Sequence, residues 1–198
     1  MVGNYTKLLA EESGFKWVID IIGHFSKYMG SFPIFDNDVI ICLNVIKEYC
    51  VFVGCLSILQ TDNGAEYCYN LIENFCSENN IKHIKSSPKH PQANGVVVIA
   101  HKEIRKLIIQ EYANSNKSFD LKNSLLEAVN IHNHNIHSIT GYRPVDIISN
   151  IDDDIYKSVI ENTKKNLNYE KKEYVFIDIG NHLLINSQIH KVGNKIVA

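Results

Sequence analysis

The first ninety residues show two apolar runs and then an alternation of helical and extended patterns, and this order restricts the fold more than any other feature. Residues 14–22 (GFKWVIDII) and 27–35 (KYMGSFPIF) are rich in β-branched and aromatic residues and are separated by GHFS. They predict an antiparallel hairpin. The elements expected next are a helix over 36–50, a strand over 54–62, a helix over 67–80 and a strand over 81–87. This alternation predicts an α/β layer with parallel strands after the hairpin.

The pattern changes beyond Gly95, where helices replace the alternation. The expected elements are long helices over 96–115 and 119–138, a short helix within 141–149, a polar helical connector over 151–172 and two or three strands over 173–198. We therefore predict a main domain over 1–150, a connector over 151–172, and the start of a small β-barrel module over 173–198.

The charge of the chain is unevenly distributed. The net charge is -2 over 198 residues, so the chain is not an overall polycation. Between Lys82 and Lys106, however, six lysines and arginines stand against the single acid Glu103, which gives a local charge of +5. Any binding of nucleic acid is expected to use this local patch.

Cysteine spacing and hydropathy argue against a zinc or redox site and against a membrane span. The five cysteines include no C-x-x-C pair, so we interpret them as reduced thiols rather than as a zinc or redox site. No apolar run approaches the roughly 20 residues that span a bilayer. We expect an intracellular protein that has no membrane partner, and a nuclear one if the source is eukaryotic.

The best candidate for chemistry is the segment LQTDNGAEY, residues 59–67. Asp62 stands at the carboxyl end of a predicted strand, where open α/β sheets bind ligands. Taken alone, Asp-Asn-Gly is also a common turn. The later loop from His90 to Gly95 (HPQANG) combines rigid or permissive backbone residues with hydrogen-bonding side chains, which is typical of loops that line a site.

TDNGAEY (61–67) together with SSPKHPQANG (86–95) resembles the catalytic core of retroviral-type integrases, in the retrotransposon-derived branch. The resemblance extends to residues 14–34 and to SLLEAVNIHNHNIHSITGYRPVDII (124–148), and the end of the chain is similar to the start of an SH3-like barrel. It implies an RNase H-like fold, in which a mixed sheet is flanked by helices. The first strand of that fold is expected to be missing, because no equivalent precedes residues 14–22.

The resemblance also implies a site in which three carboxylates hold two Mg²⁺ or Mn²⁺ ions for phosphoryl transfer. The second family carboxylate matches Asp62. The third should follow after 35 intervening residues (98 − 62 − 1), and that position is Val98, whose hydrocarbon side chain cannot bind a metal. Glu103 would point about 140° away on the helix. Asp20 is the alternative for the first carboxylate, although relatives usually have an aliphatic residue there.

Only Asp62 is therefore expected as a metal ligand, with weak binding, and we do not expect catalysis by this chain. Nucleic-acid contacts are predicted from one face of the helix and the loop before it: Lys89, His90, Gln92, Asn94, Lys102 and Arg105. The alternative is a solvated basic helix. His132, His134 and His137 resemble a metal cluster, but residues i and i+2 of a helix face different ways, so we interpret them as structural.

These observations support three hypotheses. The first is a DNA-binding, inactive domain derived from the integrase of a mobile element. The second is a fragment of an active integrase that performs metal-dependent DNA strand transfer. The third is a domesticated module for dimerisation or other interactions, and the resemblance itself implies a homodimer.

Overall fold

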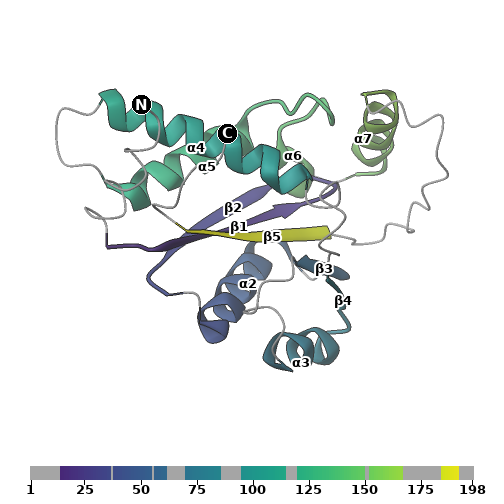
Figure 1. The fold of residues 1–198 in the computed structure, drawn as a ribbon. Coiled ribbons are helices and arrows are strands. Elements are labelled where there is room, and N and C mark those ends of the chain that lie inside the picture. The colour runs from purple at the N-terminus through teal and green to yellow at the C-terminus, as the bar shows by residue number, and fades with distance from the viewer. Residues whose placement is uncertain are drawn as a thin grey trace.

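The computed structural model describes residues 14–36, 38–54, 56–61, 70–85, 95–114, 120–149, 152–166 and, as backbone, 184–191. The strands are β1 (Trp17–Gly23), β2 (Met29–Ile34), β3 (Ile58–Thr61), β4 (Lys82–Lys85) and β5 (Leu184–Lys191). The helices are α2 (Val39–Val53), α3 (Asn70–Glu78), α4 (Gly95–Asn114), α5 (Leu121–His134), α6 (Pro144–Ser149) and α7 (Asp153–Asn166). The strands form one sheet, with α2 and α3 on one face and α4 and α5 on the other (Figure 1).

The strand order across the sheet is β2-β1-β5-β3-β4. β1 and β2 pair antiparallel, from Trp17 opposite Ile34 to Ile22 opposite Met29, so the predicted hairpin is confirmed. β3 and β4 pair in parallel, and α3 connects them. The predicted class, a mixed α/β sheet flanked by helices, is therefore also confirmed.

The last described strand differs from the sequence prediction. Residues 173–198 were expected to begin a separate β barrel, but residues 184–191 form β5 in the centre of the main sheet. β5 runs antiparallel to β1 on one side and parallel to β3 on the other. Its polar alternation in LINSQIHK is typical of a half-exposed strand, which is why the sequence did not predict a central position.

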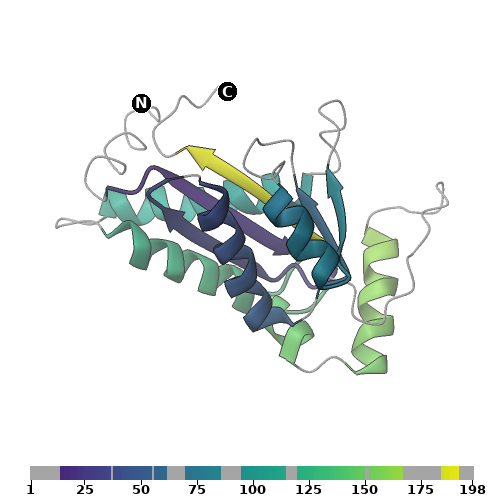
Figure 2. The same ribbon diagram turned by 90° about the horizontal axis from the view of Figure 1, so that it is seen from below.

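Two buried clusters hold the layers together, one on each face of the sheet. Figure 2 views the sheet from the side of α2 and α3. Ile19 and Ile21 of β1 belong to the cluster under these helices. Val18 and Ile22, which alternate with them, pack with Ile104 and other residues of α4 and α5. Because β1 is buried on both faces, it is apolar along nearly its whole length, apart from Asp20.

Helix α7 packs on the loop that follows α5, although the sequence predicted a solvated connector. Val159 is fully buried, and the rings of Tyr156 and Phe25 lie 5.4 Å apart. Asn162 Nδ2 donates a hydrogen bond of 2.9 Å to the carbonyl of Thr140. α7 is therefore attached to the core through specific contacts. Among the described residues, no helix combines the length and hydrophobicity needed to cross a bilayer.

Asn133, near the end of α5, attaches that helix to the edge of the sheet. Its Oδ1 accepts a hydrogen bond of 2.8 Å from the backbone N–H of Met29, and its Nδ2 donates one of 2.8 Å to the carbonyl of Met29. Asn133 is only 3% exposed. One side chain thus satisfies both backbone groups of a buried residue on edge strand β2.

We expect Asn133→Ala to lower the free energy of unfolding by about 2 to 3 kcal/mol, because it leaves two buried backbone groups of Met29 unsatisfied. Urea denaturation followed by circular dichroism measures this. Asn130→Ala, at an exposed position of the same helix, is the matched control and should change stability by less than about 0.5 kcal/mol. Equal effects of the two substitutions would contradict the structural role of Asn133.

Candidate functional site

The carboxyl end of β3 lies directly before the predicted metal ligand. Thr61, the last residue of β3, is fully buried, and its Oγ1 lies 2.9 Å from His83 Nε2 of β4. This contact lies at the end of β3, which occupies part of the strand predicted over 54–62. Asp62 itself lies outside the described residues. The same holds for four predicted contact residues in the loop before α4: Lys89, His90, Gln92 and Asn94.

Asp20 of β1, the alternative metal ligand, is 1% exposed and is held by two side chains. The Ser31 hydroxyl of β2 donates a hydrogen bond of 2.5 Å to Oδ1. His101 Nδ1 of α4 lies 2.5 Å from Oδ2. Both carboxylate oxygens are therefore engaged, and a metal ion at Asp20 would compete with the partly buried side chain of His101.

The described residues do not fit a two-metal site. Within the ranges that the structure describes, no three His, Cys, Asp or Glu side chains converge so that they could hold a metal ion. Position 98 lies in the first turn of α4, one turn before His101. A valine at this position supplies no oxygen ligand for Mg²⁺ or Mn²⁺.

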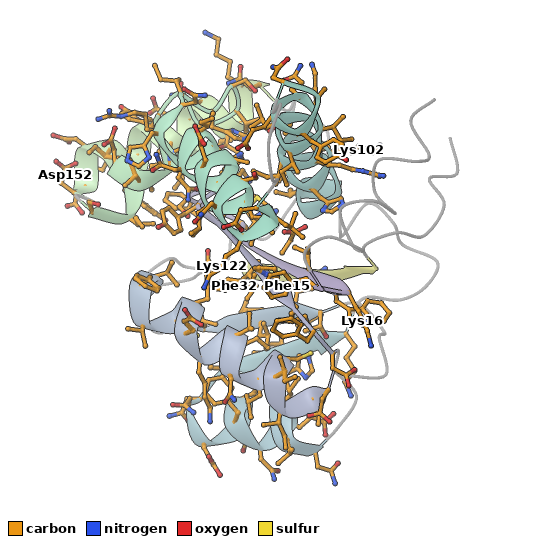
Figure 3. The ribbon with its side chains drawn as sticks, turned by 90° about the vertical axis from the view of Figure 1, so that its left-hand side faces the viewer. Phe15, Lys16, Phe32, Lys102, Lys122 and Asp152 are labelled. Atoms are coloured by element: carbon orange, nitrogen blue, oxygen red, sulfur yellow. The ribbon has the colours of Figure 1, made fainter. Side chains whose placement is uncertain are left out.

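Helix α4 has an apolar side that is buried towards the sheet and a cationic side that is exposed to solvent. Ala100, Ile104 and Ile108 are buried against the sheet side. Lys102 is exposed and extends from α4 into solvent (Figure 3), and Arg105, three residues on, is partly exposed. Positions i and i+3 of a helix are neighbours, so the two cations share a face, as predicted. Partial burial lowers the pKa of Arg105, whose guanidinium remains charged at neutral pH.

Glu103 faces α5 and not the sheet. Its side chain is 60% exposed, and its Oε2 lies 3.7 Å from His132 Nδ1. This placement agrees with the prediction that Glu103 cannot replace the acid expected at position 98. The carboxylate instead lines a cavity of about 380 Å³ between α4 and the end of α5.

The three histidines near the end of α5 have separate structural contacts. His132 Nε2 lies 3.0 Å from the carbonyl of Lys27, whereas His134 Nδ1 lies 2.9 Å from the carbonyl of Asn130. His137 Nδ1 accepts a hydrogen bond of 3.3 Å from the N–H of Ile139. The rings of His132 and His137 also lie 6.3 Å apart.

The sequence did not predict the buried lysine beside these histidines. Lys27, in the turn between β1 and β2, is 3% exposed and has a φ of 62°. Its Nζ donates a hydrogen bond to the carbonyl of His24. Burial lowers the pKa of Lys27 to about 8. Burial, together with the charges of Lys27 and His132, lowers the pKa of His137 to about 4. The only feature of the sequence that pointed to Lys27 was its place next to the polar turn predicted between two strands.

Comparisons with known proteins relate the chain to retroelements. No protein-family profile matches it. A stretch of 108 residues, 54% of the chain, is 26% identical to the retrovirus-related Pol polyprotein from transposon 412 of Drosophila melanogaster. A stretch of 56 residues, 28% of the chain, is 38% identical to the Gag-Pro-Pol polyprotein of Mason-Pfizer monkey virus. The matched segments make up only 9% and 3% of those polyproteins.

Solved structures show the same fold. The chain is similar to a simian T-cell lymphotropic virus intasome in complex with PP2A regulatory subunit B56 gamma, with a TM-score of 0.63, 18% identity, and coverage of 68% of this chain and 48% of that one. It is also similar to the HTLV-2 integrase catalytic core domain in complex with magnesium, with a TM-score of 0.58 and 18% identity. The matched region covers 68% of this chain and 86% of that domain. The predicted integrase-type fold is thus confirmed.

Because the pKa of His137 is about 4 in the folded protein and near 6.5 in the unfolded chain, the unfolded state takes up the proton first as the pH falls. We expect stability to decrease from pH 6.5 towards pH 4. His137→Asn, which keeps an acceptor near Ile139, should reduce this decrease by on the order of 1 kcal/mol. Denaturation at several pH values measures it. His134→Asn, at an exposed position, is the control, and an equal effect there would refute the assignment.

Proposed function

We propose that this chain, an integrase-like domain with the fold of retroviral integrase catalytic cores, binds DNA and does not catalyse strand transfer. The observation that carries the proposal is the contrast along α4. Lys102 and Arg105 lie on an accessible face, whereas His101, next to Lys102, contacts the buried Asp20. The helix thus presents two cationic side chains on its outer side. Beneath it, the carboxylate of Asp20 already contacts Ser31 and His101.

The DNA-binding part of the proposal rests on charge and placement. Lysine and arginine side chains neutralise phosphates, and this electrostatic contribution dominates the affinity for duplex DNA. Lys102 and Arg105 lie near the middle of α4, which begins at Gly95, the last residue of the HPQANG segment. The loop and the helix face would together form one basic surface, with the loop residues near the bases or the backbone.

The inactivity part rests on the carboxylates. Phosphoryl transfer with two metals needs several oxygen ligands on facing elements. Asp62 is one candidate ligand, but position 98 is a valine, and Asp20 already contacts Ser31 and His101. A metal at this end of the sheet would therefore be under-coordinated. The residues of this chain support weak cation binding and no reaction step.

Replacing Lys102 and Arg105 together by alanine should weaken binding to a short fluorescent DNA duplex and reduce the slope of log affinity against log salt concentration by about 1 for each lost phosphate contact. Fluorescence anisotropy over a salt series measures both quantities. Lys157→Ala, at an exposed position on α7, is the matched control. An affinity that does not fall with salt would refute DNA binding through phosphates.

Val98→Glu alone should not restore strand transfer in Mg²⁺ or Mn²⁺, because Asp20 remains held by His101 and no further ligand is supplied. A gel-based strand-transfer assay with labelled duplex ends tests this, with Val98→Gln as an uncharged control of the same length. Turnover by the unmodified chain that Asp62→Asn abolishes would overturn the inactive assignment.

A further inference from the structure

The cavity of about 380 Å³ between α4 and the end of α5 opens beside the cationic side of α4. The two helices lie next to each other on one face of the sheet (Figure 1). Lys106 lines the cavity and is exposed, and it stands one turn after Lys102. Residues i and i+4 of a helix are neighbours, so both cations lie at the mouth of the cavity. Binding cavities for small molecules range upward from about 300 Å³, so this one suits a small ligand.

The walls of the cavity are apolar and reach the solvent. Ile104 of α4 is its buried floor, at 2% exposure, and Leu107 of the same helix is partly exposed. Ile131 and Ile136 come from the end of α5 and the residues after it, and they are 38% and 71% exposed. A flat ligand between these side chains would remove their apolar surface from water. The faces of a nucleobase provide such a flat surface.

Two side-chain amides also line the cavity. Gln110 belongs to α4 and Asn135 follows α5, and both residues are exposed. Among the described residues, no hydrogen bond engages either amide group. A side-chain amide carries a donor and an acceptor, and the edge of a nucleobase carries both as well. The cavity therefore combines apolar walls for the faces of a base with polar groups for its edge.

Glu103 restricts which base fits. Of the described residues that line the cavity, it is the single acid, and its side chain is 60% exposed. A carboxylate accepts a hydrogen bond from the exocyclic amino group of cytosine. Thymine has a carbonyl oxygen at the same place, and two acceptors repel each other. The cavity therefore favours cytosine over thymine.

Other ligands agree less well with these residues. In the part of the chain that the structure describes, no three metal-binding side chains converge, so Glu103 and His132 do not form a metal site. A cationic side chain of a protein partner would meet Lys102 and Lys106 beside the single acid. A purely apolar segment of a partner would bury the two amides without hydrogen-bond partners, which is unfavourable. The charges and amides together favour nucleic acid.

We propose that this cavity binds an unpaired nucleobase, with cytosine preferred to thymine, beside a DNA backbone that lies on α4. The inference rests on the proposed DNA binding and adds the part of the nucleic acid that the cavity takes. Lys102 and Lys106 contact the neighbouring phosphates. The base lies between Leu107 and Ile136, and its amino group donates to Glu103. Bases inside a duplex are stacked and paired, so the ligand is a base in a single-stranded extension.

The test measures binding of the full chain to three labelled probes by fluorescence anisotropy. The probes are one short blunt duplex, the same duplex with a single-stranded extension of cytosines, and the same duplex with an extension of thymines. The cytosine extension should strengthen binding at least about five-fold, which is the size expected for stacking of one base. The thymine extension should give a smaller gain. Glu103→Gln should remove the difference between the two extensions.

The cavity is tested by a pair of matched variants. Ile136→Ala shortens one wall at an exposed position and should reduce the gain from the cytosine extension to less than about two-fold. Ile40→Ala is the control, because Ile40 is 57% exposed and lies on α2, on the other face of the sheet. It should leave the gain intact.

The outcomes separate this inference from the proposed function. If none of the probes binds, the proposed DNA binding fails and the inference fails with it. If the blunt duplex binds in a salt-dependent way and the extensions add nothing, the inference alone is overturned. A gain that Ile136→Ala leaves intact would overturn it too, and would leave the cavity to a protein partner. Equal losses in Ile136→Ala and Ile40→Ala would also contradict a base-binding site at this cavity.

Discussion

The backbone hydrogen bonds of β5 join the two halves of the sheet, and the arrangement of the helices depends on this connection. β2 and β1 form one half, and β3 and β4 form the other. α4 contacts both β1 and β5, so it bridges the connection on one face. Residues 184–191 therefore complete a sheet whose other described strands lie within residues 17–85. Because β5 is far in sequence from β1 and β3, bringing these strands together costs conformational entropy.

The Asp20 carboxylate is the polar centre of this arrangement. It receives Ser31 from the neighbouring strand and His101 from the helix above. His101 contacts Asp20 from the helix whose residues Ala100, Ile104 and Ile108 are buried, and Lys102 of the same helix is exposed. A buried acid that is satisfied by hydrogen bonds costs little, whereas an unpaired one is strongly destabilising. Asp20 therefore functions here as a positioning residue for the helix.

The sequence predicted those parts of the fold whose signals are local. The hairpin follows from two apolar runs, and the helix α2 follows from Asp38, whose side chain accepts a hydrogen bond of 2.7 Å from the N–H of Ile40. The structure places Glu103 beside His132 of α5 and leaves Lys102 exposed, and the predicted roles of Lys102 and Arg105 stay predictions. The sequence prediction missed the buried Lys27, because burial of a turn lysine depends on α5 and the loop after it. It also missed the place of β5, because an alternating strand does not reveal its partners.

The two apolar clusters explain how the helices are held on the two faces of the sheet. The buried members of the cluster under α2 and of the cluster under α4 are hydrophobic residues of the sheet, its helices and the adjoining loops, and they include Cys42 and Cys76. Burial of this apolar surface is the main stabilising contribution in a domain of this size. None of it requires a bound cation. The packing that holds β1, α2 and α4 together therefore does not depend on a carboxylate at position 98.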